Sequence, residues 1–289
     1  MATSILQEKI LEIYKEIKRI CEMHELRYYA IGGTAIGTVR HSGFIPWDDD
    51  IDIAMPWVDY QKFLDFAQEE LPNNFKLRIS HATVGSSIFF DKVQNIDTSF
   101  IEIAELNHPG AYKGIFVDIM PLFGVTANTS RFRNLCKMNL LIHKLHNKKK
   151  SCICDMKTAK AKMMWVVSYP INMLVPMEFW YHAWLKLVAN RDFDSSEYTG
   201  YLWSSELSNR LLFPTLWFED YVEMPFEDTI MRLPIGYNEM LTKQFGNYMM
   251  PPSDEDRKTH SGGIVDVDRS YKFYQKEYSM KGTLEEYLK

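Results

Sequence analysis

The chain has 289 residues, of which 46% are hydrophobic and 25% are charged, and this composition excludes a disordered protein. Its 38 acidic residues outnumber its 33 lysines and arginines, for a formal net charge of -5. Because neutralising nucleic-acid phosphates requires an excess of basic residues, a general nucleic-acid-binding function is excluded as well.

The cysteines and apolar segments predict a cytoplasmic protein. Four cysteines in a chain of this length do not form a disulfide framework, and the sequence starts with a charged amphipathic helix instead of a signal peptide. The stretch from 163 to 184 is apolar, but Pro170, Pro176 and polar residues interrupt it. We therefore expect no transmembrane helix.

The first part of the chain predicts a helix, a short strand and a second helix. Apolar residues recur at steps of three and four from Leu6 to Ile20, which is typical of an amphipathic helix. Residues 27–31 (RYYAI) predict a short buried strand, and Gly32-Gly33 ends it. We expect Thr34 to cap the brief helix that follows.

A second strand and a third helix come next. In DDDIDIAMP, Ile51 and Ile53 alternate with Asp50 and Asp52, the period-two pattern of a strand with one hydrated face. Residues 58–71 then show helical periodicity up to Pro72. Four β-rich runs follow, and with the earlier strands they predict one mixed sheet with helices on one side, an α+β fold; these runs are 75–80, 87–93, 99–103 and 114–119.

The rest of the chain divides in two. Residues 128–191 have helical periodicity and are rich in Lys, Met and Trp, whereas short strand-like runs and one helix between Pro234 and Gly246 follow residue 197. We predict three parts: a catalytic core (1–127), a basic, Met- and Trp-rich helical subdomain (128–196), and a C-terminal part that completes the core and the site (197–289).

The acidic strand predicts a metal site. Alternate residues of a strand point to one face, so Asp50 and Asp52 place two carboxylates close together, where they repel each other unless a cation lies between them. Carboxylate oxygens suit Mg²⁺ or Mn²⁺, and Mg²⁺ takes one or two such ligands beside substrate phosphate. We expect Asp48 at the strand entrance, as a supporting or loop group, and Asp49 facing away.

The glycine turn predicts a phosphate site beside the metal. Gly32, Gly33 and Thr34 open a helix, and free backbone N–H groups at the start of a helix bind phosphate. Arg40 lies further along this helix and can reach a phosphate oxygen. The third acid is predicted to be Asp118, because a carboxylate between Val117 and Ile119 on a buried strand requires a partner or a metal. A salt-bridged core aspartate is the alternative.

The stretch IGGTAIGTVRHSGFIPWDDDIDIAMP, residues 31–56, closely resembles the signature of the LicD family, which also includes relatives of fukutin and fukutin-related protein. FVDIMPL, with Asp118, and residues 226–260 are similar to the family too. The resemblance covers about residues 5–125 and 210–260 and leaves out the basic helical middle.

The resemblance implies a nucleotidyltransferase fold that moves phosphocholine, or a related phospho-alcohol, from a CDP-linked donor to a sugar hydroxyl of a surface glycan. Asp50 and Asp52 would bind Mg²⁺ on the donor diphosphate, and Asp118 would complete the metal site and activate the acceptor. Two further candidates contact substrate in this hypothesis: Trp47 for the quaternary ammonium of choline, and His260, with its basic neighbours, for phosphate.

Two other functions are open at this stage. The same fold can transfer a nucleotidyl group to a small molecule, with attack at the proximal phosphorus. A catalytically idle scaffold that binds a glycan or a protein is the third hypothesis, and two self-repelling carboxylates argue against it.

The basic middle has two interpretations. Residues 131–162 contain ten basic residues against the single acid Asp155, for a net charge of +9. This block is either a solvated helical face or a surface that contacts anionic lipid or an anionic lipid-linked glycan. Cysteines and histidines of the same region suggest zinc, but their spacing matches no closed structural site; they are Cys136, His143, His146, Cys152 and Cys154.

Overall fold

The computed structural model describes residues 3–79, 90–102, 112–125, 129–148, 158–188, 192–201, 210–253, 257 and 263–281. Its helices and strands, in chain order, are α1 (Ile5–Met23), β1 (Tyr29–Ala30), α2 (Gly32–His41), β2 (Asp52–Pro56), α3 (Trp57–Glu70), β3 (Phe75–Arg78), β4 (Asp91–Asn95), β5 (Ser99–Glu102), β6 (Ile115–Val125), α4 (Thr129–Lys148), α5 (Ala159–Leu174), α6 (Met177–Val188), β7 (Tyr198–Gly200), β8 (Leu212–Pro214), the 3-10 helix η3 (Thr215–Phe218), β9 (Tyr221–Phe226), β10 (Thr229–Pro234), α7 (Tyr237–Phe245), β11 (Gly263–Asp266) and α8 (Tyr271–Lys281).

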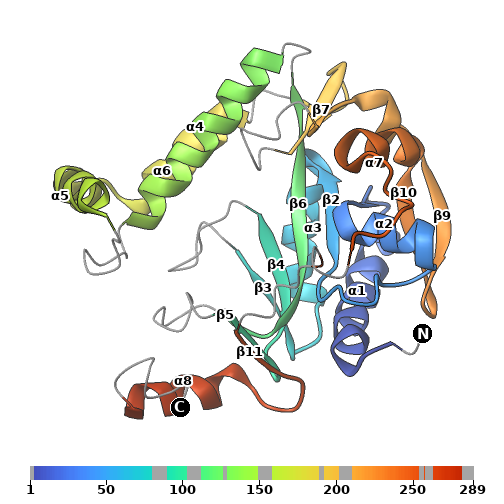
Figure 1. Ribbon diagram of the computed structural model, residues 1–289, viewed down its shortest axis with the longest axis horizontal. Coiled ribbons are helices and arrows are strands. Elements are labelled where there is room, and N and C mark those ends of the chain that lie inside the picture. Colours follow the sequence, from blue (N-terminus) through green and yellow to red (C-terminus); the bar gives the residue numbers. More distant parts are fainter. Residues whose placement is uncertain are drawn as a thin grey trace.

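A mixed sheet forms the centre of the α+β fold (Figure 1). Its strands follow the order β1-β2-β6-β4-β3, and β7 and β8 continue it beyond the far end of β6. Strand β6 runs parallel to β2 and antiparallel to β4 and β7. All eleven residues of β6 are buried, as expected of a central strand covered on both faces.

The long strand β6 extends past the predicted end at Ile119. The β-rich run of the sequence covers residues 114–119, and proline, which donates no backbone hydrogen bond, follows at position 121. In the structure, β4 pairs with β6 up to Ile119 and β7 pairs with it from Phe123 onward. Pro121 therefore lies between the two partners, where its missing N–H leaves no broken bond on that edge.

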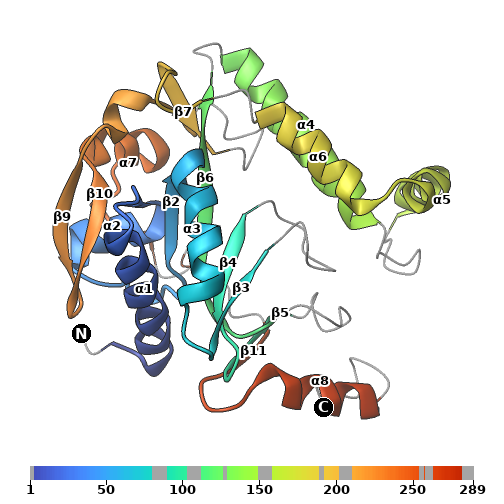
Figure 2. The ribbon, with the colours of Figure 1, turned by 180° about the vertical axis from the view of Figure 1, so that it is seen from behind.

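Helices α1 and α3 pack against one face of the sheet (Figure 2). The apolar stripe of α1 is fully buried at Ile10, Ile13, Ile17 and Ile20, which confirms the predicted amphipathic helix. A capping box at Ser4 and Gln7 fixes where this helix begins.

One strand belongs to a different sheet from the predicted one. The sequence pattern places residues 99–103 in the main sheet, but β5 pairs with β11 in a separate two-stranded sheet. The partner strand is more than 160 residues away in sequence, from Gly263 to Asp266. Local β propensity identified the strand and carried no information about this partner.

The middle of the chain is helical where the structure describes it, as predicted. Helices α4 and α6 pack together beyond the end of β6, and α5 lies at their far end, away from the sheet (Figures 1 and 2). Within the described ranges, no helix combines the length with the apolar character that crossing a bilayer demands.

Candidate functional site: an acidic cluster at the start of β2, beside β6

Strands β2 and β6 bring two aspartates side by side. Asp52 and Asp118 are register partners in the parallel pair, and the Asp118 N–H donates to the carbonyl of Ile51 over 2.9 Å. Register partners on neighbouring strands point to the same face of a sheet, so these two carboxylates share one space. Two residues that are distant in sequence thus meet in the site.

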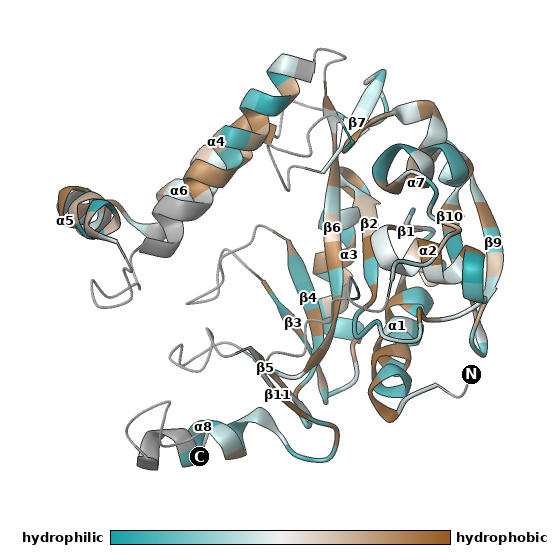
Figure 3. Cartoon of the chain, in the orientation of Figure 1, coloured by the Kyte–Doolittle hydropathy of each residue, from teal (hydrophilic) through white to brown (hydrophobic). Residues whose placement is uncertain are grey.

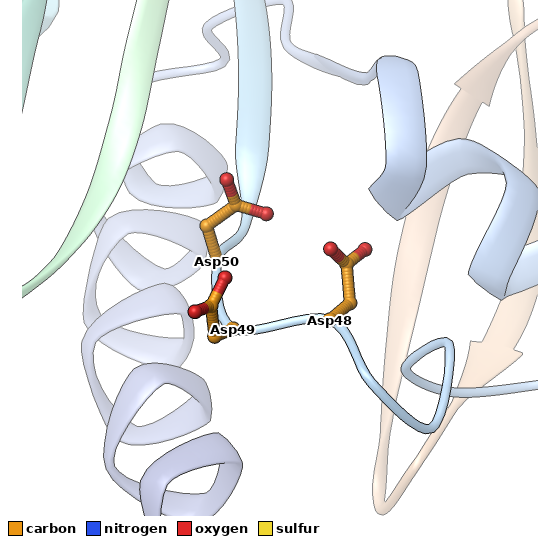
Figure 4. A group of neighbouring side chains, drawn as sticks. All are labelled: Asp48, Asp49 and Asp50. Carbon is orange, nitrogen blue, oxygen red and sulfur yellow. The ribbon is translucent and has the colours of Figure 1, made fainter. Parts of the chain in front are cut away.

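The loop before β2 adds three more carboxylates. Asp48, Asp49 and Asp50 each have a carboxylate oxygen within 4.8 Å of those of the other two (Figure 4). The expectation that Asp49 faces away is therefore wrong. Strand pairing begins only at Asp52, so the alternation of a strand does not govern the three residues before it.

Two elements hold this loop in place. The Gln7 side chain of α1 donates from Nε2 to the carbonyls of Asp48 and Ile45, over 2.9 and 3.3 Å. The Phe44 N–H donates to Oε1 of Glu227, in the turn between β9 and β10, over 2.9 Å. Gln7 is buried, and its amide therefore ties the first helix to the acidic loop.

The glycine turn allows the carboxylates to approach the start of α2. Gly32 has a φ of +56°, a conformation that costs other residues free energy. A Cβ atom on Gly33 would lie 2.6 Å from Oδ2 of Asp48, and one on Gly32 would lie 3.4 Å from Oδ2 of Asp52. Gly33 thus leaves room for the Asp48 carboxylate in its present position, Gly32 is favoured by its backbone conformation, and the predicted phosphate donors and metal ligands lie next to each other.

Thr34 is not the N-cap of the helix that the sequence predicts. Helix α2 begins at Gly32 with Ile31 as its N-cap, so Thr34 already lies within the helix. Its buried hydroxyl accepts a hydrogen bond of 2.8 Å from the N–H of Asp52. The hydroxyl therefore joins α2 to the first residue of β2.

Burial and mutual repulsion perturb the central carboxylates. Burial raises the pKa of Asp52 well above its usual value, and the charges of Asp50 and Asp118 raise this pKa further. Burial also raises the pKa of Asp118, against the opposing effect of Lys92. A divalent cation among these oxygens would relieve the repulsion, so the donor set fits Mg²⁺ or Mn²⁺.

Lys92 is a site residue that sequence reasoning missed. Its Nζ lies 2.8 Å from Oδ1 of Asp118 and 3.4 Å from the centre of the Phe116 ring. Both charged side chains are largely buried, so each one compensates the desolvation of the other. A lysine inside the β-rich run FFDKVQN was the available signal.

Arg40 lies at the edge of the acidic cluster. Its Nη1 donates to the carbonyl of Tyr248 over 2.7 Å. Burial lowers the pKa of Arg40, while the nearby charge of Asp48 raises it. The guanidinium group is thus oriented by the segment after α7 and lies within the field of the carboxylates.

Trp47 already has a cation on its ring. The guanidinium carbon of Arg257 lies 4.2 Å from the centre of the half-buried ring. Arg257 therefore covers the ring that the sequence-based hypothesis assigns to the quaternary ammonium of choline. His260 lies outside the described residues.

Two further residues from the later part of the chain, Tyr201 and Gln244, interact with each other and were not predicted from the sequence. Gln244 of α7 donates from Nε2 to the Tyr201 hydroxyl over 2.9 Å. Burial raises the pKa of Tyr201, and the negative charge of Asp52 raises it further. Neither residue belongs to a pattern that marks a site in the sequence alone.

The zinc interpretation finds no support among the described residues. Cys21 and Cys136 are free, buried thiols, and burial raises the pKa of Cys136 to about 11, which disfavours the metal-binding thiolate. Cys152 and Cys154 lie outside the described residues.

Comparisons with known proteins identify the family of this chain. The lipopolysaccharide cholinephosphotransferase LicD of Haemophilus influenzae is 27% identical over 255 residues, which cover 86% of this chain and 92% of the relative. An uncharacterized protein of Rickettsia typhi is 37% identical over 82 residues, or 27% of this chain and 25% of that protein. The sequence model of the LicD/FKTN/FKRP nucleotidyltransferase domain matches residues 25–234. Since this match spans most of the sequence and contains the whole acidic cluster, the chain belongs to the LicD family.

Proposed function

We propose that this chain transfers phosphocholine, or a related phospho-alcohol, from a CDP-linked donor to a sugar hydroxyl of a cell-surface polysaccharide or its lipid-linked precursor, in a metal-dependent reaction at the cytoplasmic side of the membrane. The observation that carries the proposal is the gathering of Asp50, Asp52 and Asp118 beside the N-terminus of α2. The similarity to the H. influenzae cholinephosphotransferase supports the nature of the transferred group.

The donor diphosphate would lie between α2 and the carboxylates. Asp50, Asp52 and Asp118 would hold Mg²⁺ or Mn²⁺, and the bound ion would neutralise phosphate charge and polarise the phosphoryl oxygens. The N–H groups of Gly32 and Gly33 would donate to the phosphates at the start of the helix. The hydrogen bond from the Asp52 N–H to the Thr34 hydroxyl fixes the start of β2 next to this turn.

Asp118 has the properties of the general base. Its raised pKa makes it a better proton acceptor than an exposed aspartate, and the ion pair with Lys92 acts against this rise by favouring the ionised form. In the proposed reaction the sugar hydroxyl gives its proton to Asp118 and attacks the phosphorus that bears choline. The bond from this phosphorus to the bridging oxygen breaks in line, and cytidine monophosphate leaves.

Arg40 and Trp47 would bind the two ends of the donor. Arg40 would stabilise the charge that develops on the departing cytidine monophosphate, and Asp48 beside it would fix the guanidinium group. The face of Trp47, which now carries Arg257, would accept the quaternary ammonium group. Donor binding would then displace Arg257 from the ring.

A donor screen tests this function. We expect the purified chain to release cytidine monophosphate from CDP-choline or another CDP-alcohol when Mg²⁺ and a glycan acceptor are present, and to stop when the metal is chelated. A nucleotidylated product would instead indicate attack at the proximal phosphorus. Calorimetry that detects no binding of any nucleotide in the presence of Mg²⁺ would favour the idle scaffold.

A further inference from the structure

Helix α5 exposes apolar side chains to solvent along its length. Met163, Val167 and Leu174 are 63%, 69% and 84% exposed. Three more residues of the helix share this property, namely Met164, Val166 and Tyr169. An exposed apolar patch of this kind is unusual on a soluble domain and marks a contact surface.

The charges of this helix are of one sign. Lys160 and Lys162 are exposed in its first turn, and no acidic residue occurs between Asp155 and Glu178. In the middle of the helix, the rings of Trp165 and Tyr169 stack with their centres 4.5 Å apart. Basic residues, exposed aliphatic residues and paired Trp and Tyr rings are the composition of helices that lie at the interface of an anionic membrane.

The position of α5 leaves it accessible to a flat surface. Both ribbon views place it at the outer end of the α4 and α6 pair, far from the central sheet (Figures 1 and 2), and the hydropathy view shows apolar residues on its outer turns (Figure 3). Helix α4 also exposes basic and apolar side chains; they include Arg133, Lys137, Met138 and Leu141.

A proline favours a position in the interface over one in the hydrocarbon. Pro170 lies inside α5 and donates no hydrogen bond to the carbonyl of Val166. An unpaired carbonyl is costly in the hydrocarbon core, whereas water and headgroups satisfy it at the surface. The helix has 16 residues, fewer than a bilayer crossing needs.

We propose that α5 docks this protein on an anionic lipid bilayer, with Lys160 and Lys162 on lipid phosphates and the exposed apolar residues among the headgroups. The use of this contact rests on the proposed function, since a surface-bound enzyme meets a lipid-borne acceptor in two dimensions. The contact itself is a binding property that is measured without catalysis.

Vesicle sedimentation of the full chain tests the docking. We expect wild-type protein to sediment with vesicles of phosphatidylglycerol mixed with phosphatidylcholine and to stay in solution with phosphatidylcholine alone. The double variant Lys160→Glu/Lys162→Glu should bind the anionic vesicles at least about thirtyfold more weakly, because two attractive charges are lost and two repulsive ones are gained. The triple variant Val166→Ser/Val167→Ser/Leu174→Ser should also bind more weakly, since it loses apolar contact area.

Two matched variants serve as controls. Lys272→Glu/Lys276→Glu makes the same change of net charge at exposed positions of α8, and Met249→Ser/Met250→Ser removes exposed apolar side chains after α7. Both controls should bind like wild type, and all variants should keep the same melting temperature. Equal losses in the controls and in the α5 variants would overturn the proposal.

Two other results would also overturn it. One is wild-type protein that does not sediment with anionic vesicles. The other is protein that does not bind vesicles but self-associates in sedimentation velocity, and that loses this self-association when α5 is substituted. This result would assign the surface to a second copy of the chain. Release of cytidine monophosphate with a water-soluble acceptor is measured in parallel, so that failure of the enzymatic proposal with intact vesicle binding is distinguishable from failure of the docking.

Discussion

At the scale of single residues, the site is a set of carboxylates whose charges are only partly compensated. Lys92 compensates Asp118, whereas Asp52 has a raised pKa and lies beside like charges. Such an arrangement destabilises the metal-free protein and favours cation binding, because a bound ion removes the repulsion. Stability and metal affinity are therefore linked through the same residues.

The pH dependence of stability should reveal this linkage. The raised pKa of Asp52 means that the folded protein holds this proton more tightly than the unfolded chain. The stabilising contribution of protonated Asp52 is therefore fully present below pH 3.8, the pKa in the unfolded chain. It is lost as the pH rises through the higher pKa of the folded protein. We expect thermal unfolding of the metal-free protein, measured in chelator over a range of pH, to show that Asp52→Asn removes the part of the fall in melting temperature that Asp52 causes as the pH rises.

The same substitution should affect turnover in the opposite direction. Loss of one charge-stabilising group costs roughly 10²–10³-fold in kcat, so Asp52→Asn should be almost inactive although the metal-free fold is stabilised. Added Mg²⁺ should raise the melting temperature of wild type and have little effect on the variant. Asp65→Asn, at an exposed position of α3, is the control and should match wild type in each measurement. A variant with full turnover would contradict the role of Asp52.

At the scale of elements, helix α2 begins with two glycines, Gly32 and Gly33. Because they have no side chains, the carboxylates of Asp52 and Asp48 can lie close to the first turn of the helix. The closest approach is that of Asp48 to Gly33, where a Cβ atom would meet the far end of a movable side chain. The contrasting position is Gly246, which ends α7 with a φ of +73° and has no neighbour within 4 Å of its Cβ position. Gly33 therefore leaves room for a carboxylate of the site, whereas Gly246 adopts a backbone conformation that other residues disfavour.

Alanine at these two positions should separate activity from stability. Gly33→Ala should displace the Asp48 carboxylate, lower the affinity for Mg²⁺ and reduce kcat roughly tenfold, with little change in the free energy of unfolding, because the carboxylate rotates away at low cost. Gly246→Ala should lower the free energy of unfolding by about 1 kcal/mol and leave kcat unchanged, because only the backbone conformation is strained. Urea unfolding and initial rates measure both effects. An equal loss of activity in the two variants would contradict this division.

At the scale of the whole molecule, the first 127 residues depend on the last part of the chain. The hydroxyls of Tyr14 and Tyr29 donate to the carbonyls of Ile230 and Phe218 over 2.9 and 2.6 Å. The rings of Phe44 and Phe226 meet edge to face, with their centres 4.9 Å apart. Strand β7 also completes the pairing of β6. The proposed catalytic core is therefore packed against residues that lie far along the chain.

Truncation should expose this dependence. A fragment of residues 1–127 loses the partners of Tyr14, Tyr29 and Phe44, and apolar surface beside β1 becomes exposed to water. We expect this fragment to show no cooperative thermal transition by circular dichroism, while the full chain shows one. A cooperative transition in the fragment would show that residues 1–127 fold on their own.

The sequence alone determined the local elements and the chemistry of the site. The stripe of α1 and the limits of α3 follow from helical periodicity, which is a property of neighbouring residues. The glycine turn and the aspartates that follow it are also local, so the motif that marks the family is recognisable in the order of the residues by itself. The metal, the donor and the role of each aspartate remain predictions.

Only the tertiary structure decided which distant groups meet. The pairing of β5 with β11, the ion pair between Lys92 and Asp118, and the hydrogen bond between Gln244 and Tyr201 each join segments that are separated in sequence. The predictions for Asp49 and Thr34 were wrong for a related reason, because the strand begins at Asp52 and the helix at Gly32. Sequence periodicity reports which face of an element is apolar, whereas pairing across the sheet is set by the packing of the whole core, and no local pattern encodes it.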